Sequence, residues 1–168
     1  MLGNQEQHKK TIFLNIKDGK ITRRNGLFFD EFDFVSGKLE QIRKVERTFN
    51  GETFLYWYMI LRGRNNERYS LGFGYNSGVF KSIILCLASD KTLSPLSEIK
   101  IETYLKEDKT KVSVYDGETR LSWITKDLPK VEILESGGKK IRNDSERMKY
   151  ICNLVTDIRF KIGDIRYD

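Results

Sequence analysis

Apolar and polar residues alternate along most of this chain, which is the pattern of half-buried β-strands. The longest apolar and aromatic run is 51–62, bounded by the turn-like Asn50-Gly51 and by a polar segment at 63–66. It predicts a central strand, too short and too polar at its ends to cross a membrane. Alternate side chains of a strand point to opposite faces. One predicted face carries Leu55, Trp57, Met59 and Leu61, which suits an interior, and the other carries Phe54, Tyr56, Tyr58, Ile60 and Arg62.

The same alternation predicts strands on both sides of this run, at 34–47, 67–75, 98–106, 111–116 and 119–124. A change of phase between Leu39 and Ile42 indicates a β-bulge near Glu40-Gln41, which would let a long strand bend. Asp18-Gly19 predicts a tight hairpin over residues 11–24, because both central positions of such a turn need positive φ. Residues 25–34 are interpreted as a connection.

Helical spacing of apolar residues replaces alternation in two places. Residues 77–89 predict a helix with Asn76 or Ser77 as its N-cap. A last helix is expected from near Asn143, and its apolar stripe needs a surface on which to dock. We therefore expect a single domain over 1–168, made of a disordered tail (1–10), a hairpin and connection (11–33), a barrel (34–124) and a C-terminal extension with the helix (125–168).

Composition adds a charge argument. The 168 residues carry 30 basic and 24 acidic side chains, a net charge of +6, which favours a polyanionic partner. Cys86 and Cys152 lie in helical apolar patterns without a C-x-x-C partner, so we expect reduced, buried thiols. The polar segment 1–10 has no apolar core of a secretory signal, and we expect a cytoplasmic protein without a membrane partner.

Three strands, a helix and two more strands follow the element order of the OB-fold, a five-stranded Greek-key barrel that binds oligonucleotides. In this order the chain resembles OB-fold single-stranded-DNA-binding proteins, in particular the replication-associated ones encoded by phages. The resemblance implies an all-β barrel with added helices: a helix between strands 3 and 4, an N-terminal β-hairpin and a C-terminal helix. It also implies sequence-tolerant single-stranded-DNA binding in replication, recombination or repair, replication proteins as partners, and the host cytoplasm if the protein is phage-encoded.

A protein that holds single strands without reading their sequence needs aromatic rings for the bases and basic side chains for the phosphates. Tyr56, Tyr58 and Arg62 lie next to the nearly bare face of the following strand, Arg68, Ser70, Gly72 and Gly74. Further candidates extend this surface: Lys38, Arg43, Arg47, Phe49, Arg64, Lys100, Tyr104 and Lys106. Trp57 and Trp123 are expected in the core.

Catalytic chemistry is not indicated. The single histidine, His8, lies in a polar segment with no cysteine or carboxylate cluster, and no Cys/His spacing fits zinc. The glycines of 72–78 do not match a dinucleotide-binding spacing. We expect no enzyme activity, no metal and no cofactor.

Two alternatives stay open. The tyrosine face could instead pack under the last helix or mediate protein contacts in a structural or assembly protein, with homo-oligomers included. An RNA-binding OB protein is the other alternative, because stacking and phosphate contact do not separate DNA from RNA.

Overall fold

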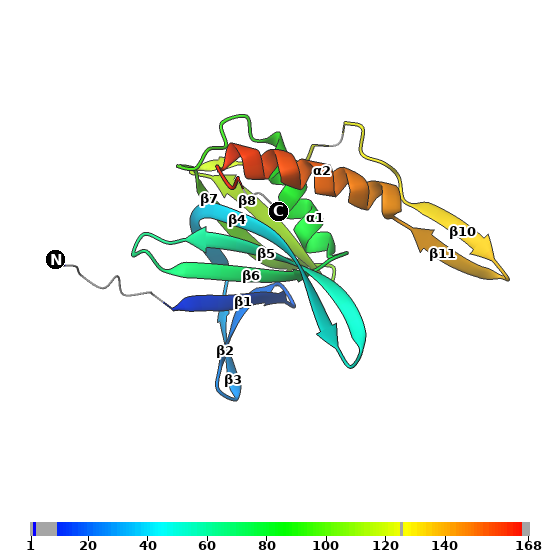
Figure 1. Cartoon of the computed structure of the whole chain (residues 1–168), viewed down its shortest axis with the longest axis horizontal. Coiled ribbons are helices and arrows are strands. Elements are labelled where there is room, and N and C mark those ends of the chain that lie inside the picture. Colours follow the sequence, from blue (N-terminus) through cyan, green and yellow to red (C-terminus); the bar gives the residue numbers. More distant parts are fainter. Residues whose placement is uncertain (1, 3–9, 125, 166–168) are drawn as a thin grey trace.

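The computed structural model describes residue 2, residues 10–124 and residues 126–165. The expected disordered start and His8 lie outside the described residues, apart from Leu2 and Lys10. In the described part the elements are, in chain order, β1 (Thr11–Lys17), β2 (Lys20–Asn25), β3 (Phe28–Phe32), β4 (Phe34–Phe49), β5 (Glu52–Arg62), β6 (Arg68–Gly74), α1 (Gly78–Ser89), β7 (Glu98–Lys106), β8 (Lys109–Asp116), β9 (Thr119–Arg120), β10 (Glu132–Ser136), β11 (Lys139–Asn143) and α2 (Ser145–Lys161). Figure 1 shows their arrangement.

Nine strands form one mixed sheet in the order β3-β2-β1-β6-β5-β4-β7-β8-β9, and β10 and β11 form a separate hairpin. β4 organises the sheet because it pairs with two strands in turn. Its residues 34–38 pair with β7, and residues 38–49 pair with β5. The register shifts between Leu39 and Gln41, so the predicted β-bulge is confirmed. The bend also requires Gly37, where a Cβ would lie 2.6 Å from the carbonyl oxygen of Arg62.

The prediction of a five-stranded OB barrel is wrong. All five strands assigned to it exist and pair as neighbours in the order β6-β5-β4-β7-β8. Closure would require the outer edge of β6 to pair with β8. That edge is instead occupied by β1, which runs parallel to β6 from Thr11 opposite Arg68 to Leu14 opposite Leu71. The N-terminal hairpin is therefore part of an open mixed sheet, with a parallel pair that a barrel assignment did not include.

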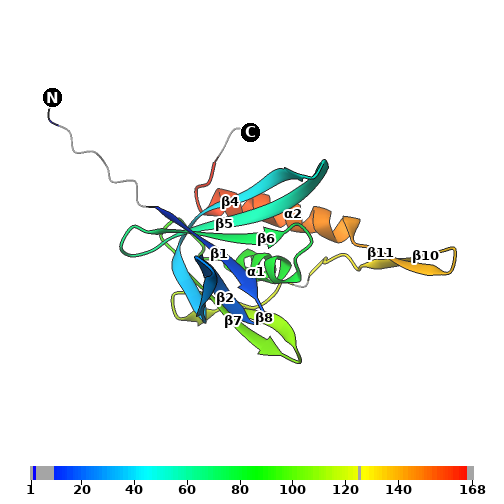
Figure 2. The ribbon, with the colours of Figure 1, turned by 90° about the horizontal axis from the view of Figure 1, so that it is seen from below.

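The two helices lie on one face of this sheet, as the views in Figures 1 and 2 agree. A single cluster of buried side chains joins the inner face of the strands to both helices, including Met59 and Leu71 from the sheet, Phe80 from α1 and Ile151 from α2. The expected docking of the last helix on the strands is confirmed. Trp57 is 3% exposed and its ring lies 4.8 Å from that of Phe80, so its assignment to the core is confirmed too.

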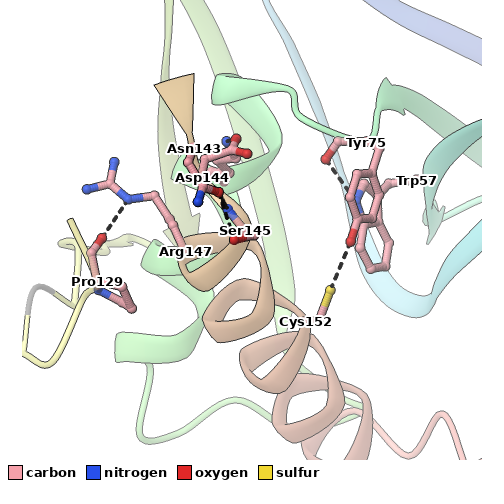
Figure 3. A network of polar contacts seen from close by, with 9 residues as sticks. Trp57, Tyr75, Pro129, Asn143, Asp144, Ser145, Arg147 and Cys152 are labelled. Atoms are coloured by element: carbon pink, nitrogen blue, oxygen red, sulfur yellow. Dashed lines mark hydrogen bonds and ion pairs between the residues drawn. The ribbon is translucent and has the colours of Figure 1, made fainter. Parts of the chain in front are cut away.

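Tyr75 connects this core to α2. Its carbonyl accepts a hydrogen bond from Trp57 Nε1 (3.3 Å), and its hydroxyl lies 3.7 Å from Cys152 Sγ (Figure 3). Both cysteines are free thiols, Cys86 buried and Cys152 half-buried. Burial raises the pKa of the Cys86 thiol to about 11.

Two further expectations need correction. Residues 25–34 are not only a connection, because β3 forms there and pairs with β2 from Ile21 opposite Phe32 to Asn25 opposite Phe28. The C-terminal extension carries the β10–β11 hairpin, which projects from the body beyond the first turn of α2 (Figure 1). No helix among the described residues has the length and apolar character that a membrane span needs.

Candidate nucleic-acid interface

The face of β4, β5 and β6 turned away from the helices carries the predicted tyrosines, and we call it the outer face. Strand pairing places Tyr58 between Arg43 of β4 and Gly72 of β6, and Tyr56 between Val45 and Gly74. Both tyrosines are half-buried, and neither belongs to the core cluster that joins sheet and helices. Because α2 packs on the opposite face, it does not cover them. The alternative in which the last helix buries these rings is therefore wrong.

Tyr58 is the best-defined aromatic group of the outer face. A Cβ on Gly72 would lie 3.2 Å from Tyr58 Cε1, so the ring leans over the bare backbone of β6. The guanidinium of Arg47 lies 5.3 Å from the centre of the same ring, within the range of a cation–π contact. A flat group, a strip of backbone without side chains and a cation thus lie side by side. This is the combination that base stacking and phosphate contact require.

Arg62, by contrast, is held by its neighbours. It forms an ion pair with Glu40 through Nε and through Nη2 (3.2 Å), and its Nη1 donates to Asn66 Oδ1 at 2.7 Å. The hydrogen bond to Glu40 raises the pKa of the guanidinium. Arg68 lies directly across from Arg62 on β6. Its Nε is buried with no hydrogen-bond partner among the described residues.

Lys38 lies where β4 changes partner, opposite Arg62 on one side and Glu98 on the other. Arg64 is in the β5–β6 turn, highly exposed, with its Nε 3.7 Å from Glu98. Phe49 is 70% exposed at the other end of the ladder, where it is the last residue of β4. These three candidates therefore lie at the two ends of the outer face and not beside Tyr58.

The candidates on β7 belong to a different surface. Lys100 Nζ lies 5.0 Å from the ring centre of Phe34, 5.2 Å from that of Tyr115, and 3.4 Å from Glu102. Tyr104 and Lys106 are exposed farther along β7, toward the β7–β8 turn. The bend of β4 separates this group from Tyr56 and Tyr58, so the structure does not bring all twelve predicted residues together.

Sequence reasoning missed two neighbours of Tyr58 on β1. Phe13 is 64% exposed and pairs with Ser70, and Asn15 Oδ1 would lie 3.6 Å from a Cβ on Gly72. Their position out of phase with Ile12 and Leu14 indicated an outer face, but nothing indicated that β1 lies beside β6. The expectation for Trp123 is wrong, because its side chain is 53% exposed.

The outer face and the rest of the described chain offer no arrangement of three or more His, Cys, Asp or Glu side chains that could hold a metal ion. Comparison with models of protein families, with curated proteins and with solved structures finds no match. A functional assignment therefore has to come from the geometry of the surface.

Proposed function

We propose that this is a non-catalytic protein that binds single-stranded DNA without sequence preference through its outer face, in replication, recombination or repair. The observation that carries the proposal is Tyr58, a half-buried ring of the outer face that lies beside the bare backbone of Gly72 and within cation–π distance of the guanidinium of Arg47. A base can stack on such a ring whatever its identity, because every base has a flat π-face.

The charges around this ring suit a nucleic-acid strand that runs along β4. Arg43 and Arg47 are exposed on that strand and flank the two tyrosines. Each basic group that meets a phosphate adds affinity by releasing a counterion, without reading the base. We expect the backbone to follow β4 and the bases to lie over Tyr56, Tyr58 and the glycines of β6.

The test is a titration of fluorescent dT and rU oligomers of about 15 nucleotides by anisotropy, at several salt concentrations and with duplex DNA as competitor. If the proposal is right, the affinity for single strands should fall steeply as the salt concentration rises. Duplex DNA should not displace the bound single strand from the protein. Comparable affinity for rU would favour the RNA-binding alternative. Tyr58→Ala should weaken binding by about 1–3 kcal/mol, whereas Phe160→Ala, which removes an exposed aromatic ring from α2, should not. No binding at low salt would overturn the proposal.

One observation favours a second candidate, an assembly protein. The β2–β3 hairpin and the strand after it expose five large apolar side chains within eight residues: Leu27, Phe28, Phe29, Phe32 and Phe34. β3 is also an edge strand, and exposed apolar edges are typical of protein contacts. Sedimentation velocity of wild type and of Phe28→Asp separates the candidates. A wild-type oligomer that this substitution dissociates, with no oligonucleotide binding in either protein, would support assembly.

A further inference from the structure

A cavity of about 490 Å³ lies on the helix side of the molecule, away from Tyr58. Its walls come from α1 and α2, from β11 and from the segment that follows β9. This volume is in the range of small-molecule sites, which are about 300–1,000 Å³. None of its lining residues belongs to β4, β5 or β6.

Positive charge dominates its lining. Lys81, Arg142 and Arg147 contribute three cations and Asp144 contributes one anion, an excess of two positive charges. Asp144 pairs with Lys81 at 3.3 Å, so the excess falls on the two arginines. Arg147 Nε donates to the carbonyl of Pro129 at 2.9 Å, which holds the guanidinium at the cavity (Figure 3). Only Nε is used in that bond, and the terminal nitrogens of Arg147 keep further donors for a ligand.

Other residues of the lining are apolar. Trp123 lines the cavity with its side chain 53% exposed, beside Leu85 and Leu128. A large exposed ring next to arginines provides a stacking surface for a planar heterocycle and donors for an oxyanion. Gly78, in the first turn of α1, also lines the cavity, so the positive end of this helix adds to the attraction for an anion.

We infer that this cavity binds a nucleoside 5′-phosphate, with the phosphate on Arg142 and Arg147 and the base against Trp123. The same chemistry occurs in a free nucleotide and at the 5′-phosphorylated end of a strand. The inference does not rest on the outer face, and a protein with Tyr58→Ala should keep this site.

Intrinsic fluorescence of the full chain provides a direct test, because Trp57 is buried and Trp123 is the exposed tryptophan of the two. Addition of AMP or dAMP should quench the emission in wild type and not in Trp123→Phe. Adenosine should bind at least about tenfold more weakly, since it lacks the charged group. Equal affinity for adenosine and AMP, or no binding of either, would overturn the inference.

Arg142→Gln should weaken AMP binding at least about tenfold by calorimetry, and Arg142→Lys should restore part of it. The matched control is Lys140→Gln, which removes a cation from the same strand at a position that does not line the cavity. If the two Gln variants bind AMP alike, the arginine has no role and the inference fails. Oligonucleotides with a 5′-phosphate and with a 5′-hydroxyl distinguish the two sources of the ligand. A preference for the phosphorylated strand that Arg142→Gln removes assigns the strand end, and AMP binding without such a preference assigns the free nucleotide.

Discussion

Asp164 accepts a hydrogen bond from the backbone N–H of Ile42 at 3.2 Å, although 122 residues separate them. The β4–β7 ladder ends where Lys38 pairs with Glu98, and beyond that point no strand of the described residues lies beside this edge of β4. The carboxylate takes the place of a strand carbonyl there. Asp164 is 8% exposed and is also paired with Arg159 at 3.3 Å. The segment after α2 thereby fixes the bent part of β4, which carries the cations of the outer face.

Asp164→Ala should lower the free energy of unfolding by about 1–3 kcal/mol, because a buried N–H loses its acceptor. Urea denaturation monitored by circular dichroism measures this change. Asp157→Ala, at an exposed position of α2, is the control and should change stability by less than about 0.5 kcal/mol. Equal effects of the two substitutions would mean that the contact with Ile42 adds nothing to stability.

Trp57 and Tyr58 are neighbours on β5 with opposite roles, and their alanine variants should differ accordingly. Trp57→Ala removes a core ring that stacks on Phe80, so it should lower the free energy of unfolding, measured by urea denaturation, by about 3–5 kcal/mol. Tyr58 lies outside the core cluster, so Tyr58→Ala should lower the free energy of unfolding by less than about 1 kcal/mol. A large loss of stability in Tyr58→Ala would show that its ring serves packing and not ligand binding.

The alternation of side chains predicted the inward-facing residues Trp57, Met59 and Leu61 of β5, which are all buried, whereas Leu55 of the same face is half-buried and Ile60 of the opposite face is buried. It was not enough to predict which strand lies beside β6. The segment with Ile12 and Leu14 and the segment with Val112 and Val114 have the same apolar period, so either could satisfy that edge. The choice depends on long-range packing, and this is why the barrel was predicted and an open sheet was found.

The candidate site shows the same division. Strand phase placed Tyr56 and Tyr58 on one face with Gly72, and pairing bears out that arrangement. The phase of a strand does not predict which long side chains contact one another. The ion pair of Arg62 with Glu40 across the bulge, and the position of Lys100 between Phe34 and Tyr115, depend on tertiary geometry.

Asp116 should make stability depend on pH. Burial, and then a hydrogen bond with Asp90, raise the pKa of its carboxyl from 3.8 to about 6, whereas Ser97 and Thr92 oppose the shift. Between about pH 4 and 6 the folded protein keeps a proton that the unfolded chain has released. The contribution of Asp116 to the free energy of unfolding is therefore fully present below about pH 4 and is lost as the pH rises to about 6.

Asp116→Asn should remove this dependence, because the neutral amide needs no proton to lie beside Asp90. The melting temperature of the variant should exceed that of wild type at pH 7 and match it at pH 4. Asp157→Asn serves as the control, since its exposed carboxylate is on α2. Parallel melting curves for wild type and Asp116→Asn over this range would contradict the assignment.

Gly72 and Gly74 give the sharpest test of the outer face, because they lie two residues apart on the same face of β6 and differ in what surrounds them. A Cβ at position 72 would lie 3.2 Å from the ring of Tyr58, whereas a Cβ at position 74 meets nothing within 4 Å. Gly72→Ala must therefore tilt or lift the ring by a few tenths of an ångström, and a base could no longer lie across the backbone there. Gly74→Ala adds the same methyl group to open space.

We expect Gly72→Ala to weaken binding of single-stranded dT by about 1 kcal/mol or more, since it disturbs one stacking position. Gly74→Ala should bind within about 0.5 kcal/mol of wild type. Anisotropy titrations at one salt concentration measure both, and melting temperatures show whether either fold is weakened. Because the added group carries no charge, the salt dependence of binding should stay the same in both variants. If the two alanine variants bind alike, the ring over Gly72 does not hold a base, and the ligand lies elsewhere on the molecule.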